Sequence, residues 1–302
     1  MTGNNNFDVI IIGGSFAGLS AAMSLARALR NVLIIDNGLP CNRQTPHSHN
    51  FITQDGKTPT EIASLAKEQV SQYNTVKFCS GTANKALKKG NTFEIKTKTD
   101  ELFYSKKLII ATGLKDIMSD IKGFADCWGI SIIHCPYCHG YEVRSEKTGI
   151  LANGDQGFEL SRLVSNWTKD LTLYTNGKST LTTEKIESLS RHNISIVETG
   201  IQHFEHIGGR IQNIAFNDGS KTPITAIYAR PASTQHSEIA LLLGCDLSEQ
   251  GRIKVDGGQH TTIDGVFACG DCASSSRDIA LAVSSGTIAG GTCNKDLIME
   301  EF

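Results

Sequence analysis

The stretch FDVIIIGGSFAGLSAAMSLARALRNVLIID, residues 7–36, decides the fold. Phe7–Ile12 is a short β-branched run, typical of a strand that is buried on both faces. After a glycine-containing turn, residues 17–30 repeat apolar side chains at helical spacing. Residues 32–35 form a second apolar run that ends at Asp36. Strand, glycine turn, helix and a second strand ending in an acid predict a dinucleotide-binding βαβ unit.

The chemistry of such a unit explains its residues. Gly13 permits the tight turn, and Gly18 allows the helix to pack closely on the strand. The free N–H groups at the helix N-terminus attract a pyrophosphate. Asp36 follows Gly13 by roughly the 20 residues expected for an acid that binds a ribose hydroxyl. Ser15 replaces the middle glycine of the usual pattern, but its side chain is small enough for a pyrophosphate to approach.

A weaker copy of this unit occurs later in the chain. Residues 149–152 and 171–174 are strand candidates on either side of a helical pattern at 158–167. Ala152 stands where the first glycine of the turn is expected, and neither an acid nor an arginine follows the second strand. The nearest cation is Lys178. The sequence therefore predicts a second dinucleotide-binding geometry whose recognition chemistry is reduced.

Composition restricts the class of protein. The 302 residues are 39% hydrophobic and 20% charged, with a net charge of −2, as in an ordinary globular protein. This balance argues against a nucleic-acid partner or a membrane surface, both of which favour basic patches. The N-terminus lacks the cationic region of a signal peptide, which predicts a cytoplasmic protein. There the nine cysteines are expected to be mostly reduced and buried.

The most reactive motif is HCPYCHGYE, residues 134–142. Cys135 and Cys138 have the spacing of a redox pair, of a metal clip or of a structural disulfide. Pro136 suits the first turn of a helix, and a helix N-terminus lowers the pKa of a thiol placed there. His139 titrates near neutrality and can act as acid or base. These features favour a redox pair.

A second CxxC, Cys269–Cys272, raises the alternative of a zinc site. The two pairs are far apart in sequence, whereas paired zinc motifs are usually about 15–20 residues apart. Free cysteines also serve as small buried packing residues. We therefore predict that the second pair is structural and that the protein has no metal site.

The glycine turn at 13–18, Ala-Thr-Gly at 111–113, the CxxC and Gly-Asp at 270–271 occur in an order that resembles the thioredoxin reductase-like branch of the FAD-dependent pyridine nucleotide-disulfide oxidoreductases. The resemblance covers nearly the whole chain. It implies an α/β, three-layer architecture with two Rossmann-like dinucleotide-binding domains. Residues 1–115 and 246–302 would form a discontinuous FAD-binding domain, and residues 116–245 an inserted nicotinamide-type domain that carries the CxxC.

The resemblance also implies roles for individual residues. Cys138 would face the flavin and Cys135 the substrate. His139 stands where thioredoxin reductases usually carry an aspartate, and in this the chain resembles dithiol oxidases. The residues implied in FAD binding are Gly13, Ser15, Ala17, Gly18, Asp36, Asn50, Thr112, Gly113, Gly270 and Asp271.

The electron partner is less well defined by the sequence. Reduced recognition at the second turn argues against NADPH and leaves oxygen or a ferredoxin-type protein as partners. We expect an FAD-dependent thiol–disulfide oxidoreductase that acts on a thioredoxin-like protein or a small dithiol or disulfide. An NADPH-dependent thioredoxin reductase is the first alternative, and a flavin redox sensor without turnover is the second. The resemblance further implies a homodimer.

Overall fold

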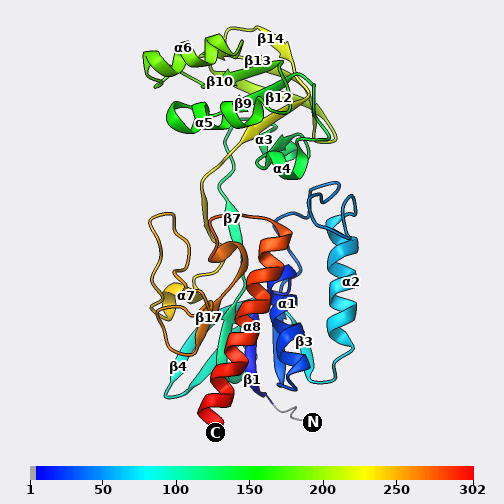
Figure 1. Ribbon diagram of the computed structural model, residues 1–302, viewed down its shortest axis with the longest axis vertical. Coiled ribbons are helices and arrows are strands. Elements are labelled where there is room, and N and C mark those ends of the chain that lie inside the picture. Colours follow the sequence, from blue (N-terminus) through cyan, green and yellow to red (C-terminus); the bar gives the residue numbers. More distant parts are fainter. Residues whose placement is uncertain (1–4) are drawn as a thin grey trace. The chain divides into compact units, whose positions relative to one another are not determined.

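The computed structural model describes residues 5–302, which divide into two compact units (Figure 1). Unit 1 contains the chain up to residue 43, residues 59–115 and residues 233–302. Unit 2 contains residues 44–58 and 116–232. Among the described residues, no helix is long and apolar enough to cross a membrane.

Unit 1 is built on one large sheet. Its strands are β1 (Asn6–Ile12), β2 (Val32–Asp36), β3 (Val76–Ser80), β4 (Ala83–Lys89), β5 (Thr92–Thr97), β6 (Leu102–Ile110) and β17 (Val266–Ala268). The order is β3-β2-β1-β6-β5-β4, and β17 also pairs with β6. The strands β3, β2, β1, β6 and β17 run parallel, whereas β4 and β5 form an antiparallel meander that joins β6. The βαβ unit predicted from residues 7–36 is confirmed.

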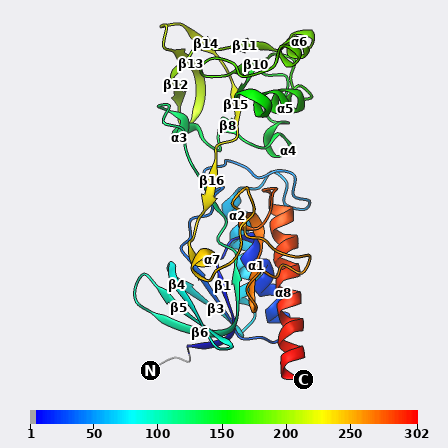
Figure 2. The same ribbon diagram turned by 90° about the vertical axis from the view of Figure 1, so that its left-hand side faces the viewer.

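Helices cover one face of the parallel strands. They are α1 (Phe16–Arg27), α2 (Pro59–Ser71) and α8 (Ile279–Glu301). Alternate apolar residues of the strands, such as Ile11 and Ile34, pack against this layer. The opposite residues, such as Ile10 and Ile35, pack against the β4–β5 meander and residues of the 239–273 segment. Figure 2 shows α8 and the meander on opposite sides of the sheet, which gives the three expected layers.

Helices α1 and α8 pack unusually closely because small residues line their contact. A Cβ at Gly286 would lie 2.2 Å from the carbonyl oxygen of Ala17, and one at Gly290 would lie 2.5 Å from that of Ala21. Helix α8 continues to Glu301, and Leu297 near its end is buried in the same layer. Helix α8 therefore fixes α1, and with it the first glycine turn.

The two units differ from the sequence-based division at two segments. Residues 233–245 lie with unit 1, because β16 (Ser233–Gln235) pairs with β7 (Leu114–Asp116) and α7 (Ile239–Leu242) buries its apolar residues in the core of unit 1. Residues 44–58 lie with unit 2. Neither placement follows from local sequence pattern.

Unit 2 contains a parallel sheet of order β11-β10-β9-β15-β8. Its strands are β8 (Ile132–Ile133), β9 (Thr148–Leu151), β10 (Leu171–Tyr174), β11 (Ser195–Val197) and β15 (Ala226–Ala229). A separate antiparallel sheet contains β12 (Ile201–Ile207), β13 (Arg210–Phe216) and β14 (Lys221–Pro223). The helices are α3 (Phe124–Cys127), α4 (Pro136–His139), α5 (Gly154–Val164) and α6 (Thr183–Arg191). The second βαβ geometry, β9-α5-β10, is confirmed.

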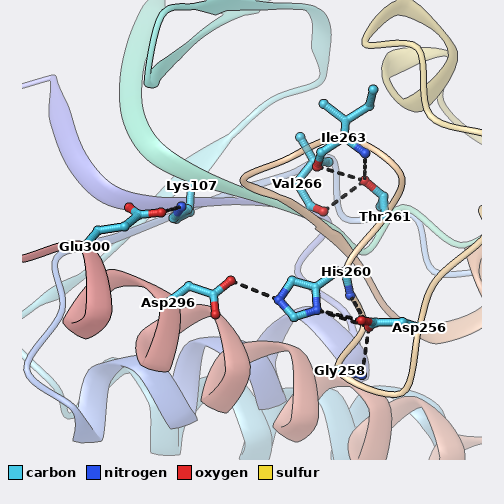
Figure 3. A network of polar contacts seen from close by, with 9 residues as sticks. All are labelled: Lys107, Asp256, Gly258, His260, Thr261, Ile263, Val266, Asp296 and Glu300. Carbon is cyan, nitrogen blue, oxygen red and sulfur yellow. Dashed lines mark hydrogen bonds and ion pairs between the residues drawn. The ribbon is translucent and has the colours of Figure 1, made fainter.

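A charged network ties α8 to a loop of unit 1 (Figure 3). His260 Nε2 lies 2.9 Å from Asp296 Oδ2 in α8, and His260 Nδ1 lies 3.0 Å from Asp256 Oδ2. Nearby, the buried Lys107 ammonium pairs with Glu300 of the same helix. Burial lowers the pKa of His260, but its hydrogen bonds to Asp296 and Asp256 outweigh that effect and raise the pKa overall.

We expect the contribution of His260 to stability to depend on pH. Because its pKa is raised in the folded state, the contribution is fully present below about pH 6.5 and is lost as the pH rises through the folded value. The side chain is 36% exposed, so solvent screening limits the effect to under about 1 kcal/mol. Thermal unfolding of His260→Gln should show a melting temperature about 1–3 °C below wild type at pH 6. This difference should disappear at pH 9.

The matched control is His192→Gln, which alters an exposed histidine of unit 2. It should leave the melting temperature close to that of the wild type at both values of pH. A deficit of His260→Gln that is the same at pH 6 and pH 9 would show that the ring acts by packing rather than by charge.

Candidate active site

The first glycine turn joins β1 to α1 and has the geometry of a phosphate cradle. Gly13 has a φ of +106°, and its N–H donates to Ile35 O at 2.9 Å. Ser15 is the N-cap of α1, and its hydroxyl makes no capping hydrogen bond. The first N–H groups of α1 are therefore not capped by this side chain. An uncapped helix start beside a tight turn suits a bound pyrophosphate.

Asp36 lies at the end of β2 and braces this turn. Its carboxylate accepts a hydrogen bond from Gly14 N at 2.9 Å and another from Gly38 N at 3.0 Å. The side chain is half-buried. The position and the remaining oxygen lone pairs suit a ribose hydroxyl next to the turn.

The late motif lies beside the same turn. Gly270 has a φ of +73°, and a Cβ at this position would lie 2.8 Å from the Cβ of Ala17. Asp271 accepts a hydrogen bond from Arg277 Nε at 3.3 Å. Burial raises the pKa of Asp271, while Arg277 opposes the shift. Gly270 and Ala17 thus bring the starts of η1 (Gly270–Cys272) and α1 together.

Thr112 and Gly113 follow β6, next to β1 and β17 in the sheet. The hydroxyl of Thr112 is buried and has no hydrogen-bond partner among residues 5–302. A buried hydroxyl is costly when it is unsatisfied, so a polar ligand atom would be favoured here. Asn50 belongs to the 44–58 segment of unit 2, where its N–H donates to Asp55 at 2.8 Å, and its place near the flavin stays a prediction.

The cysteine pair is oxidised. Cys135 and Cys138 form a disulfide with a Cα–Cα distance of 5.3 Å. Cys135 is the N-cap of α4, and its sulfur accepts a hydrogen bond from Cys138 N at 3.2 Å. Pro136 occupies the first turn, as predicted. Both cysteines are half-buried, so the disulfide is within reach of a substrate.

His139 ends α4 and is half-buried in unit 2. Burial lowers the pKa of its imidazole, Glu142 opposes this shift and His49 adds to it. His49 itself lies 3.5 Å from Glu142 Oε1 and 3.5 Å from Asp55 Oδ2. His139 is therefore largely neutral near pH 7 and ready to accept a proton.

His49 and Glu142 both contribute to the surroundings of His139, although no sequence motif marks them as site residues. The one signal in the sequence was the pair of histidines in TPHSHN, residues 45–50. Two histidines in a polar loop more often belong to a solvated surface, and nothing in their spacing connects them to α4.

The second CxxC lies in the core of unit 1. Cys269 and Cys272 are reduced and buried, and burial raises the pKa of Cys272 to about 12. The pKa of Cys269 is also raised well above its usual value by burial. Thiols in this state do not act as nucleophiles near neutral pH. Among the described residues, no group of three or more His, Cys, Asp or Glu side chains could hold a metal ion.

The side chain of Asn153 forms hydrogen bonds with the backbone of the second glycine turn and of the loop after β10. Asn153 is the N-cap of α5, and its Oδ1 accepts hydrogen bonds from Gly154 N at 2.8 Å and from Thr180 N at 2.9 Å. Its Nδ2 donates to Lys178 O at 2.9 Å. One side chain therefore ties the turn to the loop that follows β10 and occupies donors that a pyrophosphate would otherwise use.

Two carboxylates, those of Glu198 and Asp155, also lie at the second glycine turn or at the loop after β10. Glu198 Oε1 accepts a hydrogen bond from Ser179 N at 2.8 Å, in the loop where a 2′-phosphate site would need cations. Asp155 occupies the first turn of α5 and pairs with Lys185 at 2.5 Å. These carboxylates are unfavourable neighbours for an additional phosphate.

Two dinucleotide-type βαβ units and a disulfide at the start of a short helix are the features of a disulfide oxidoreductase. The chain belongs to the pyridine nucleotide-disulphide oxidoreductase family, whose model matches residues 7–286. Within this family it is a thioredoxin reductase-like, FAD-dependent oxidoreductase.

Similar proteins cover almost the whole chain. Thioredoxin reductase tcpT from Claviceps purpurea is 32% identical over 314 aligned residues, which cover 99% of this chain and 97% of the relative. Thioredoxin reductase aclD from Aspergillus oryzae is 31% identical, with 94% of each chain covered. The crystal structure of a putative thioredoxin reductase TrxB from Bacillus anthracis aligns with a TM-score of 0.94 at 28% identity, over 98% of this chain and 100% of that one.

Proposed function

We propose that the protein is an FAD-dependent thiol–disulfide oxidoreductase in which Cys135 and Cys138 exchange electrons with a dithiol or disulfide substrate. The observation that carries the proposal is the accessible disulfide at the start of α4, directly followed by His139. Unit 1 is the proposed FAD-binding domain, and unit 2 is the proposed nicotinamide-type domain with the redox pair.

The residues around the first turn fit a bound FAD. The uncapped start of α1, at Ser15, would receive the pyrophosphate, and Asp36 would receive the adenosine ribose. The buried hydroxyl of Thr112 would gain the partner that it lacks among the described residues. When bound, FAD would exchange two electrons with the cysteine pair and with a second partner.

The chain's own residues then account for the thiol chemistry. A substrate thiolate attacks the sulfur of Cys135, forms a mixed disulfide and releases Cys138 as a thiolate. The second substrate thiolate attacks the mixed disulfide, which releases the cyclic or bridged disulfide product and leaves both cysteines reduced. Two electrons and two protons pass from the substrate to the pair. His139, neutral near pH 7, accepts a proton from the attacking thiol and returns it to Cys138.

The partner that exchanges electrons with FAD is proposed to be oxygen or a ferredoxin-type protein rather than NADPH. The hydrogen bonds of Asn153 and the carboxylate of Glu198 support this proposal, because they replace the donors and cations that a nicotinamide nucleotide uses. The relatives named thioredoxin reductase favour the second candidate, an NADPH-dependent enzyme with a thioredoxin-like substrate. A homodimeric state remains a prediction.

The electron donor can be tested on purified, anaerobic holoenzyme. We expect a dithiol such as dithiothreitol to bleach the visible flavin band, and admitted air to restore it. NADPH and NADH should each bleach it at least about tenfold more slowly, since one lost charge-assisted hydrogen bond accounts for a factor of that size. Stopped-flow absorbance measures all three rates.

Each contrary outcome selects a different function. Bleaching by NADPH at the rate seen with the dithiol would support the NADPH-dependent thioredoxin reductase. A flavin that neither dithiols nor nucleotides bleach would point to a protein electron donor or to a redox sensor without turnover.

A further inference from the structure

A pocket of about 580 Å³ opens within unit 2, next to the redox motif. Its lining includes Ile133, two residues before Cys135, and His139, which directly follows Cys138. The pocket thus contacts the chain on both sides of the disulfide. Its volume lies within the usual range of about 300–1,000 Å³ for small-molecule sites.

The charges in this pocket are unbalanced. Glu142 is the one acidic residue in its lining, and it pairs with His49. Lys147 and Arg210 also line the pocket, and neither forms an ion pair with an acid in the described part of the chain. Two cations without acidic partners favour a ligand that carries an anionic group.

The remaining lining is largely apolar. Ile130, Val143 and Ile224 contribute hydrocarbon surface to this lining. Such a wall favours an apolar body between the anionic group and the sulfur atoms of a ligand. A folded protein partner would not fill a pocket of this size.

From these features we propose that the pocket binds a small dithiol or disulfide that carries a carboxylate, with Lys147 and Arg210 holding the carboxylate. The proposal rests on the proposed thiol–disulfide function and specifies its substrate class. The apolar body lies along Ile130, Val143 and Ile224, so that the sulfur atoms are directed towards the side of the pocket formed by His139.

Dihydrolipoate and dihydrolipoamide make a matched pair of probes. Both carry the same dithiol, but dihydrolipoate ends in a carboxylate and dihydrolipoamide in a neutral amide. With anaerobic holoenzyme, we expect the second-order rate constant of flavin bleaching to be about tenfold higher for dihydrolipoate than for dihydrolipoamide. A factor of this size corresponds to one charge-assisted hydrogen bond. The double variant Lys147→Gln/Arg210→Gln should reduce this preference to less than about twofold, chiefly by lowering the rate with dihydrolipoate. Higher salt should weaken the preference in the wild type.

Lys169→Gln is the matched control, since it removes an exposed lysine of unit 2 that does not line the pocket. It should keep the full preference for dihydrolipoate. Equal rates for the two probes in the wild type would overturn the proposal, and so would a preference that survives the double substitution.

Equilibrium binding separates this proposal from the proposed function. Calorimetric titration with oxidised lipoate and lipoamide should show tighter binding of lipoate to the wild type and equal binding to the double variant. If that pattern appears but neither dithiol bleaches the flavin, the pocket is supported and the redox function fails. If lipoate and lipoamide bind equally to the wild type, the anion-binding pocket fails whatever the flavin does.

Discussion

Cys138→Ser is expected to abolish bleaching of the flavin by dithiols while the protein keeps its flavin. Serine cannot form a disulfide, so Cys135 is left as a single thiol without a partner to resolve or regenerate the bond. We expect the bleaching rate to fall at least about a thousandfold, on the scale of losing an essential nucleophile. Anaerobic stopped-flow absorbance gives the rate, and the absorbance ratio at the flavin and protein bands gives the flavin content.

The geometry makes this variant a clean test. The hydrogen bond to the sulfur of Cys135 comes from the backbone N–H of residue 138, which a serine retains. Helix α4 should therefore keep its N-cap. Cys79→Ser is the matched control, because Cys79 is a half-buried free cysteine in β3 of unit 1. Turnover that persists in Cys138→Ser would rule out the proposed flavin-side role of this residue.

The fold was largely predictable because its elements have strong local signals. The βαβ unit begins with the buried run Phe7–Ile12 and is held by contacts close in sequence, so periodicity and glycine spacing suffice to predict it. Strand β5 alternates buried residues with exposed or half-buried ones, a local pattern that indicates a strand. The end of α8 has no such local signal, because its last turns are held by burial of Leu297 and by ion pairs of Glu300 and Glu301 with distant residues.

Long-range placement limits what could be predicted about the candidate site. Cys135, Cys138 and His139 share one short motif, so their proximity could be predicted from the sequence. The effect of His49 on the pKa of His139 depends on the 44–58 segment lying with unit 2. No periodicity or spacing encodes that contact. The sequence also indicated that the second glycine turn has lost residues that recognise a nucleotide. The hydrogen bond from Thr180 N to Asn153 joins residues 27 positions apart, so it could not be predicted from local sequence.

Gly18→Ala is the second change with a large expected effect. It is expected to disturb the glycine turn between β1 and α1 and not the thiol chemistry of the cysteine pair. A Cβ at residue 18 would lie 1.8 Å from the carbonyl oxygen of Gly13, a distance at which backbone must move. Gly13 cannot yield easily, because its N–H donates a hydrogen bond to Ile35 O and a Cβ at Gly13 itself would lie 2.2 Å from Ala111 O. The clash therefore falls on the turn proposed to hold the flavin pyrophosphate.

Helix α1 cannot yield easily either. Gly286 of α8 lies close to α1, because a Cβ at Gly286 would lie 2.2 Å from the carbonyl oxygen of Ala17, so α1 cannot move towards α8. We expect Gly18→Ala to lose at least about 3 kcal/mol of unfolding free energy, as overpacking against fixed backbone does. The protein should be purified with little or no flavin, and thermal unfolding should show a melting temperature lower by at least about 6 °C.

Gly291→Ala separates this clash from the general effect of adding a methyl group to a helix. Gly291 lies in α8, is exposed, and a Cβ there would meet no atom within 4 Å. Alanine is favoured over glycine inside a helix by up to about 1 kcal/mol, so this variant should be as stable as the wild type or slightly more so. It should also retain its flavin. If Gly18→Ala behaved like Gly291→Ala, the close approach of α1 to the Gly13 turn would not be required for the cradle.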